Sequence, residues 1–201
     1  MRLSPEQWDN WYRTGRPTVV SHKEAAFVYD HVALKPGTSA VDLACGTGQW
    51  TRQLAAWGLA AYGFDFSTEA LRQASAAASA NVTYARWDID SAPIPHLLQP
   101  RTVDLVTCRY ALPYLQHGRL MTDIGRWLTP DGTFYALVRL KPTSITSSPA
   151  HTGPHPPTAE ALFHRGFTEE QIHTLGAGWA SQEVYSLSPH KRVIILRGYG
   201  Q

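Results

Sequence analysis

The chain has 201 residues, of which 43% are hydrophobic and 17% charged, as expected for one globular domain. Its formal net charge of +2 is too small to indicate a nucleic-acid or anionic-membrane partner by itself. Two cysteines provide no disulfide framework, the first 17 residues lack the apolar core of a signal peptide, and no stretch is apolar for long enough to span a bilayer. We therefore expect a single-domain cytoplasmic protein without a membrane or nucleic-acid partner, whose oligomeric state the sequence does not give.

The N-terminal part of the chain, residues 1–35, is expected to form a helical cap. Its first helix is predicted over residues 4–14 and its second over residues 22–33. Ser21 is a suitable N-cap for the second helix, and Pro36-Gly37 ends that segment.

Strands and helices alternate in the core, residues 37–140, which predicts βαβ units and a parallel sheet. Strands are expected over 39–45, 60–66, 81–88, 102–110 and 133–140, helices over 49–58, 67–80 (with Ser67 as N-cap) and 118–128, and turns over 91–100 and 129–132.

The remaining chain is expected to differ from this pattern. Residues 141–158 are rich in Pro, Ser and Thr without periodicity, which predicts a long flexible loop. Residues 159–201 are expected to supply a helix over 167–178 and two strands, 179–188 and 191–199, which a short turn pairs antiparallel.

A glycine-rich stretch, Cys45-Gly46-Thr47-Gly48, ends the first predicted strand of the core just before a helix. Ligands of parallel sheets bind outside the carboxyl ends of the strands. Glycine lets a backbone approach a ligand, and a helix N-terminus offers unpaired N–H groups, so the stretch predicts a cofactor cradle. The third glycine of the dinucleotide fingerprint is replaced by Thr51, which argues against a nicotinamide or flavin.

Asp42-Leu43-Ala44-Cys45-Gly46-Thr47-Gly48 resembles motif I, D-x-G-x-G-x-G, of the class I S-adenosylmethionine-dependent methyltransferases. Four further elements follow in that family's order: Gly63-Phe64-Asp65-Phe66-Ser67, Trp87-Asp88-Ile89, Val103-Asp104-Leu105-Val106 and Leu128-Thr129-Pro130-Asp131-Gly132. The resemblance covers roughly residues 37–199. It implies an α/β, Rossmann-like fold with a seven-stranded, mostly parallel sheet and an antiparallel last strand. It also implies S-adenosyl-L-methionine as cofactor and methyl transfer as the reaction. A small-molecule acceptor, for example in specialised metabolism, is expected because the sequence has no basic patch or appended recognition domain and because its aromatic N-terminal cap and long loop can close over a pocket.

The resemblance assigns Asp65 to the ribose hydroxyls and Asp88, with the N–H of Ile89, to the adenine edge. Asp42 lies further back in its strand, where we expect it to fix the glycine loop. The complete set of expected cofactor-binding residues is Asp42, Ala44, Cys45, Gly46, Thr47, Gly48, Asp65, Phe66, Asp88, Ile89 and Arg109. Ala44 departs from the family motif because it replaces the first glycine.

The residues that would act on the substrate are less well defined. Because the sulfonium methyl is already activated, transfer depends mainly on alignment, and a general base is needed only for a poorly acidic acceptor. Tyr110 and Tyr114 follow the fourth strand and are the candidate catalytic residues, with core packing as the alternative; many family members carry a His near position 114. The candidate lid or substrate residues are Trp8, Trp11, Tyr12 and His22, with a packing helix or a solvated face as the alternative.

Other functions remain open from the sequence. These are an RNA or protein methyltransferase, a non-catalytic partner protein that binds S-adenosylmethionine, and a nicotinamide-dependent oxidoreductase, against which Thr51 and Asp42 argue. His151 and His155 lie in the proline-rich loop without a Cys or acid beside them, so no metal site is expected.

Overall fold

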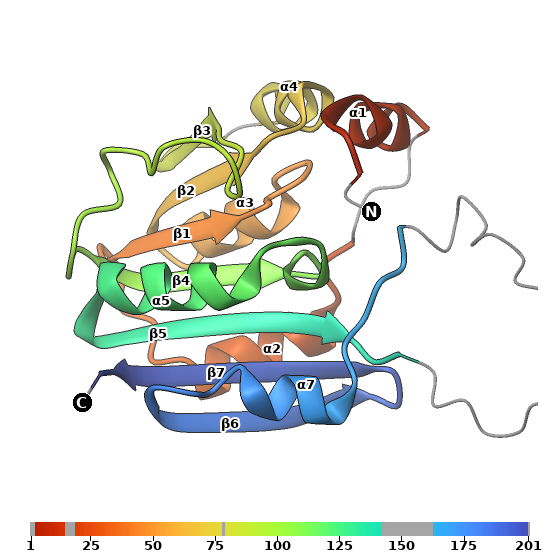
Figure 1. The fold of residues 1–201 in the computed structure, drawn as a ribbon. Helices are drawn as coiled ribbons and strands as arrows, with labels where there is room; N and C mark the ends of the chain where they lie inside the picture. Colours follow the sequence, from red (N-terminus) through yellow and green to blue (C-terminus); the bar gives the residue numbers. More distant parts are fainter. Residues whose placement is uncertain (1–2, 15–18, 78, 142–162, 201) are drawn as a thin grey trace, which may run out of the picture.

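The computed structural model describes residues 3–14, 19–77, 79–141 and 163–200. One sheet of seven strands, in the order β3-β2-β1-β4-β5-β7-β6, forms its centre (Figure 1). The first five strands pair in parallel, and β7 runs antiparallel to both β5 and β6. The predicted sheet is therefore confirmed. Its strands are β1 (Ser39–Leu43), β2 (Ala60–Asp65), β3 (Val82–Arg86), β4 (Val103–Arg109), β5 (Leu128–Arg139), β6 (Trp179–Ser188) and β7 (Lys191–Tyr199).

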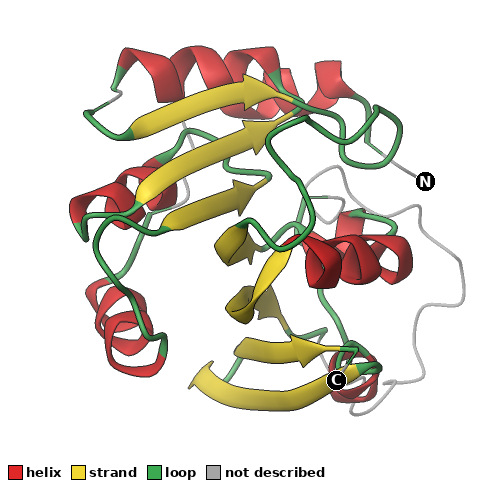
Figure 2. Cartoon of the chain, turned by 90° about the vertical axis from the view of Figure 1, so that its left-hand side faces the viewer, coloured by secondary structure: helices red, strands yellow, loops and turns green. Residues whose placement is uncertain are grey.

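Helices cover both faces of the sheet (Figure 2). On one face Trp50 packs against Tyr135, and on the other Ile124 and Ile172 pack in the cluster that contains Phe134. Phe134 and Tyr135 are neighbours on β5, so they point to opposite faces, as the two-residue period of a strand requires. The helices are α1 (Pro5–Arg13), α2 (His22–His31), α3 (Gln49–Ala56), α4 (Thr68–Ala76), the 3₁₀ turn η1 (Leu112–Tyr114), α5 (His117–Trp127) and α7 (Glu169–Thr174).

The predicted N-caps are confirmed. The hydroxyl of Ser21 accepts the N–H of Glu24 at 3.2 Å, and that of Ser67 accepts the N–H of Ala70 at 3.1 Å. The two N-terminal helices have different places: α2 packs on the face of the sheet through Val28, whereas α1 lies beside α4 at the carboxyl ends of the parallel strands (Figure 1).

Three predicted boundaries were wrong. Residues 129–132 belong to β5 and form an irregularity in that strand. They lie between Leu128, which pairs with Val103 of β4, and Thr133, which pairs with Leu105. Helix α4 ends at Ala76, and Ala77, Ser79 and Ala80 beyond it are exposed, so they provide no packing that would extend the helix. Helix α7 covers only Glu169–Thr174, since Gly176 and Gly178 follow it.

Within the described ranges, no helix has the length and apolar character needed to cross a membrane. The predicted loop over residues 141–158 lies, apart from Lys141, outside the described residues.

Candidate cofactor and substrate cavity

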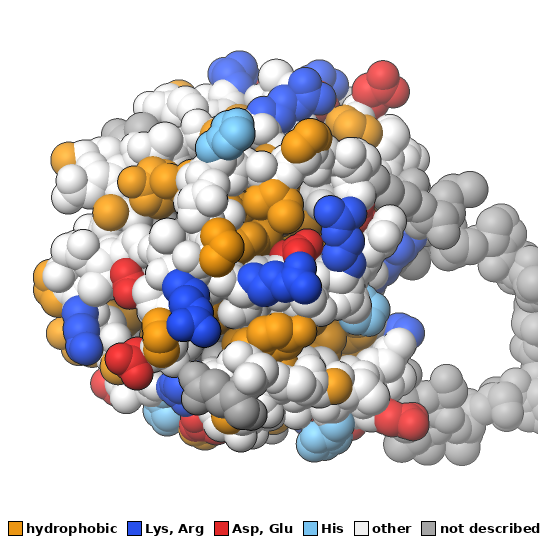
Figure 3. All heavy atoms as spheres, turned by 60° about the vertical axis from the view of Figure 1, so that its left-hand side comes forward, with side chains coloured by type: hydrophobic (Ala, Val, Ile, Leu, Met, Phe, Trp, Pro, Cys, Tyr) orange, Lys and Arg blue, Asp and Glu red, His pale blue; other side chains and the backbone are white. Residues whose placement is uncertain are grey.

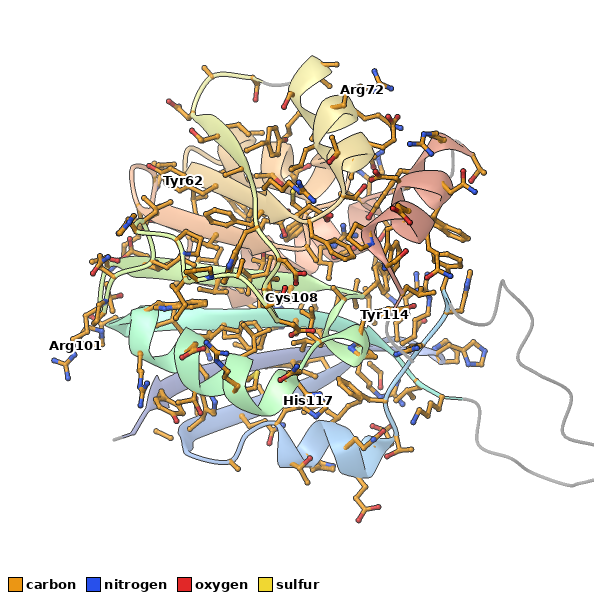
Figure 4. The ribbon with its side chains drawn as sticks, turned by 45° about the horizontal axis from the view of Figure 1, so that its top comes forward. Tyr62, Arg72, Arg101, Cys108, Tyr114 and His117 are labelled. Carbon is orange, nitrogen blue, oxygen red and sulfur yellow. The ribbon has the colours of Figure 1, made fainter. Side chains whose placement is uncertain are left out.

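A cavity opens at the carboxyl ends of the parallel strands, beneath α1. Of the residues that the sequence assigned to a site, all except Gly48 and His22 line it. His22 is exposed at the start of α2, while Gly48 lies behind the cavity wall as the N-cap of α3. Figure 4 places Tyr114 at this end of the molecule and Arg101 at the opposite end. The strands thus bring together residues that lie as far apart in sequence as Trp8 and Arg139.

The loop after β1 has the backbone conformation that its glycines allow. Gly48 has a φ of +72°, and a Cβ built there would lie 2.2 Å from the hydroxyl oxygen of Tyr84. That hydroxyl donates to the Gly48 carbonyl at 3.1 Å, so β3 approaches the loop too closely for any side chain. Ala44 also has a positive φ, of 54°, in the position where the family motif has glycine. The loop therefore leads directly from β1 into the N-terminus of α3, where Gly48 is the N-cap.

Asp65 ends β2 with a buried carboxylate. One oxygen accepts the N–H of Gly46 and the other that of Ser67, each at 2.8 Å. Burial raises the pKa of Asp65 to about 6, although these N–H donors favour the ionised form. Since each carboxylate oxygen can accept more than one hydrogen bond, Asp65 can also receive hydroxyl groups of a ligand in the cavity.

Asp42 connects three elements of the core. Its carboxylate accepts the hydroxyl of Thr51 on α3 at 2.7 Å and that of Thr107 on β4 at 3.0 Å. Burial raises the pKa of Asp42 to about 6. The carboxylate thereby fixes the helix that follows the glycine loop.

Arg109 lines the cavity, and its guanidinium is bound by Glu24 of α2. Nε lies 2.5 Å and Nη2 2.7 Å from the two carboxylate oxygens, and the side chains are only 7% and 2% exposed. The hydroxyl of Tyr135 donates to the same carboxylate at 3.2 Å. The charge of Arg109 is therefore balanced within the fold, by a partner that no motif in the sequence indicated.

Aromatic side chains form the wall of the cavity below α1. Trp8 meets Tyr114 edge to face, with 5.3 Å between the ring centroids, and Trp11 stacks on Phe163 at 4.4 Å. Trp8 also contacts Phe163 at 5.0 Å. This aromatic wall (Trp8, Trp11, Tyr114 and Phe163) joins α1 to the segment that returns after residue 162.

Helix α1 is held in place by polar contacts with α4. The carboxylate of Asp9 accepts the hydroxyl of Ser67 at 2.5 Å and the N–H of Glu69 at 3.1 Å. The side-chain amide of Gln73 donates to the carbonyl of Tyr12 at 3.0 Å. Asp9 thus lies at the N-terminus of α4, where a negative charge is favourable.

Arg139 and Phe163 are among the lining residues that the sequence did not assign to the site. Arg139 ends β5, so the rule that ligands bind at the carboxyl ends of strands could have identified it. Phe163 follows the proline-rich region, and no periodicity or motif distinguished it.

The two cysteines behave as protonated thiols. Cys45 lines the cavity, and burial raises its pKa well above the ordinary value, with Asp65 and Asp42 adding to the effect. Cys108, on β4 (Figure 4), is fully buried and does not line the cavity, and burial raises its pKa as well. Neither is suited to act as a nucleophile.

The described part of the chain contains no group of three or more His, Cys, Asp or Glu side chains arranged to hold a metal ion. His151 and His155 lie outside the described residues.

Comparisons with known proteins agree with this architecture. Residues 40–132 match a family model described as a methyltransferase domain. A search of curated protein sequences found no match. Similar solved structures include phosphoethanolamine N-methyltransferase 2 of Haemonchus contortus, in complex with phosphomonomethylethanolamine and S-adenosylhomocysteine, with 16% identity and a TM-score of 0.75 over 96% of this chain. This chain spans only 57% of that protein.

Two further similar structures have about the same length as this chain. The S-adenosylmethionine-dependent methyltransferase of Mesorhizobium loti is 22% identical, with a TM-score of 0.67 over 88% of this chain and 98% of its own. A methyltransferase of the same cofactor class from Aquifex aeolicus is 15% identical, with a TM-score of 0.69 over 97% of this chain and 98% of its own. The family model and the fold together confirm the resemblance of this chain to class I S-adenosylmethionine-dependent methyltransferases.

Proposed function

We propose that this protein transfers a methyl group from S-adenosyl-L-methionine to a small molecule. The observation that supports this most is the convergence of the segments that carry the motifs. The ends of β1, β2 and β3 place Gly46, Asp65 and Asp88 around one side of a single cavity, and β4 and β5 extend it beneath α1.

The residues of this cavity fit the proposed cofactor. The glycine loop exposes its backbone to the cavity. It also contacts α1, because a Cβ on Gly46 would lie only 2.9 Å from the hydroxyl of Tyr12. Asp65 would accept the ribose hydroxyls, and Asp88 with the N–H of Ile89 would bind the adenine edge. The bound cofactor would supply an electrophilic methyl group on a sulfonium.

The contribution of the chain itself is alignment of two reactants and exclusion of water. The aromatic wall closes the cavity on the side of α1. The hydroxyl of Tyr114 accepts the N–H of Arg165 at 3.0 Å, and burial raises its pKa. Tyr114 therefore stays a phenol that can position an acceptor but does not deprotonate it. Tyr110 also lines the cavity, directly after the end of β4.

A small acceptor is supported by the shape of the site. The cavity is lined by side chains of α1 and by the aromatic wall, so an acceptor that reaches its interior must fit beneath them. At the opposite end of the sheet, hydrophobic, basic and acidic side chains lie intermixed (Figure 3). Such a mixture is unlike the continuous basic stripe of many nucleic-acid-binding surfaces.

Labelled cofactor can test the class of acceptor. The protein is incubated with S-adenosylmethionine labelled in its methyl group, together with separate metabolite, RNA and protein fractions of a cell extract. We expect label to enter the metabolite fraction, and to do so less with Asp65→Asn. Transfer confined to RNA or protein would contradict the small-molecule assignment, and binding without transfer to any fraction would contradict the catalytic one.

A further inference from the structure

The half of the cavity opposite the proposed cofactor site has an unusual arrangement of positive charge. Arg139, the last residue of β5, lines the cavity, and its guanidinium carbon lies 4.5 Å from the centroid of the Tyr110 ring. Lys191, the first residue of β7, is directly opposite Arg139 in the antiparallel pair. Its ammonium nitrogen lies 5.7 Å from the same ring. The guanidinium carbon of Arg109 lies 5.5 Å from this ring as well, so three cations surround one aromatic ring, and two of them, Arg139 and Lys191, are opposite each other on the sheet.

The nearby acids do not neutralise this pair. Glu24 is occupied by Arg109, and Glu169 pairs with Arg192, the neighbour of Lys191. Among the residues that the structure describes, no carboxylate lies within ion-pair distance of Arg139 or Lys191. Like charges directly opposite each other on a sheet are destabilising, so the arrangement costs stability when no anion is present.

The carboxylates of the cavity lie on its other side. Asp42 and Asp65 are on β1 and β2, and Asp88 follows β3, whereas β5 lies beyond β4 in the strand order. The cavity is therefore acidic where the cofactor motifs lie and basic where the methyl acceptor would bind. The aromatic wall adjoins the basic half through Tyr114.

We propose that the methyl acceptor is an anionic molecule with an aromatic or apolar body, whose carboxylate or phosphate group is bound by Arg139 with the support of Lys191. This inference rests on the proposed function, because it assigns the cofactor to the other half of the cavity. A guanidinium suits the role since it presents paired N–H donors to a planar carboxylate or to a phosphate. Tyr110 holds the guanidinium in place by stacking, and its own backbone is in the left-handed region with φ of 60°.

Matched probe molecules test this inference. The full chain is saturated with S-adenosylhomocysteine, and the binding of phenyl phosphate is compared with that of phenol, and of benzoate with benzyl alcohol, at constant ionic strength. We expect the anionic member of each pair to bind at least about tenfold more tightly, from hydrogen bonds to a charged group. Comparing the two anions distinguishes a phosphate from a carboxylate preference.

Arg139→Gln should remove this preference, and Lys191→Gln should reduce it. Arg119→Gln, on the surface of α5 where Arg119 pairs with Asp123, is the control and should keep it. Without any ligand, Arg139→Gln should melt at the same temperature as the parent or higher, because a like-charge pair is relieved. If Arg139 had only a structural role, Arg139→Gln would lower the melting temperature instead.

Equal binding of charged and neutral probes, or a preference that survives Arg139→Gln, would overturn the inference. So would a tenfold loss of S-adenosylhomocysteine affinity in Arg139→Gln, which would assign the guanidinium to the carboxylate of the cofactor. Failure of the proposed function has a different signature, because the parent chain would then bind no S-adenosylhomocysteine at all.

Discussion

The strained residue Ala44 occupies the backbone position where the family motif has glycine. Its φ of 54° lies in the left-handed region, which costs an ordinary residue about 1–2 kcal/mol. The chain accepts that cost at the point where β1 turns into the proposed cofactor loop. Strain of this kind is common at functional sites.

We predict that Ala44→Gly stabilises the protein. Relief of strain is partly offset by about 0.4–1 kcal/mol of extra freedom in the unfolded chain, which leaves a net gain of about 0.5–1 kcal/mol. Thermal and urea unfolding would measure it. Ala40→Gly, within β1 and with ordinary φ, is the control and should be destabilising. A loss of stability in Ala44→Gly as large as in the control would show that the backbone at Ala44 is not strained.

Asp65 should make cofactor affinity depend on pH. The ionised carboxylate is the better acceptor of ribose hydroxyls, and burial raises its pKa to about 6. Below this pH the carboxyl group is protonated, so S-adenosylhomocysteine should bind about tenfold more weakly at pH 5 than at pH 7.5, as expected when a charged acceptor becomes neutral. Calorimetry across this range would show the change.

The pKa of Asp42 is also about 6, so a variant must separate the two groups. Asp65→Asn should bind weakly at every pH with a flat profile, while Asp42→Asn should keep the pH dependence. If the reverse is found, protonation of Asp42, and not of Asp65, controls the pH dependence of cofactor affinity.

At the level of elements, the succession of strands and helices along the chain was predictable because each βα unit carries its own local signals. The hydrophobic runs marked the strands, Ser21 and Ser67 marked the helix starts, and the glycine loop marked the site. The ion pair of Glu24 with Arg109 was not predictable, because the two residues are 85 positions apart and neither lies in a motif. Phe163 reaches the aromatic wall only because the returning segment docks beside β5, a contact that no local pattern specifies.

That docking depends on one glycine. Phe167 donates its N–H to the carbonyl of Arg139 and accepts that of Lys141, both at 2.9 Å. A Cβ on Gly166 would lie 2.4 Å from the Arg139 carbonyl oxygen. The segment can therefore approach the end of β5 only without a side chain at this position.

We expect Gly166→Ala to displace this segment and to lower stability by about 1–3 kcal/mol, because the two backbone hydrogen bonds are disturbed. Unfolding measurements would give the loss. Gly118→Ala on α5 is the control, since a Cβ there meets nothing within 4 Å and should be tolerated or slightly stabilising. Equal stability of the two variants would show that the segment docks in another way.

For the whole molecule, α1 is a cover that the central sheet does not require. Among residues 3–14, Leu3 alone is fully buried, and the contacts of α1 with α4 are mainly polar. Deleting residues 1–16 should leave a folded core but lower methyl transfer far more than it lowers the melting temperature, because water enters the cavity and the aromatic wall is broken. Asn10→Ala, on the exposed side of α1, should change neither quantity. A truncated protein with full turnover would contradict a covering role for α1.

The most direct test of the central claim, that the cavity binds S-adenosylmethionine, is the melting temperature of the full chain with S-adenosylhomocysteine and, separately, with NAD. At a hundredfold excess over the dissociation constant, a ligand of the folded state adds about 2.7 kcal/mol of stability. We predict a clear rise in melting temperature with S-adenosylhomocysteine, a smaller rise in Asp65→Asn at the same concentration, and none with NAD. A rise with NAD, and none with S-adenosylhomocysteine or S-adenosylmethionine, would contradict the account.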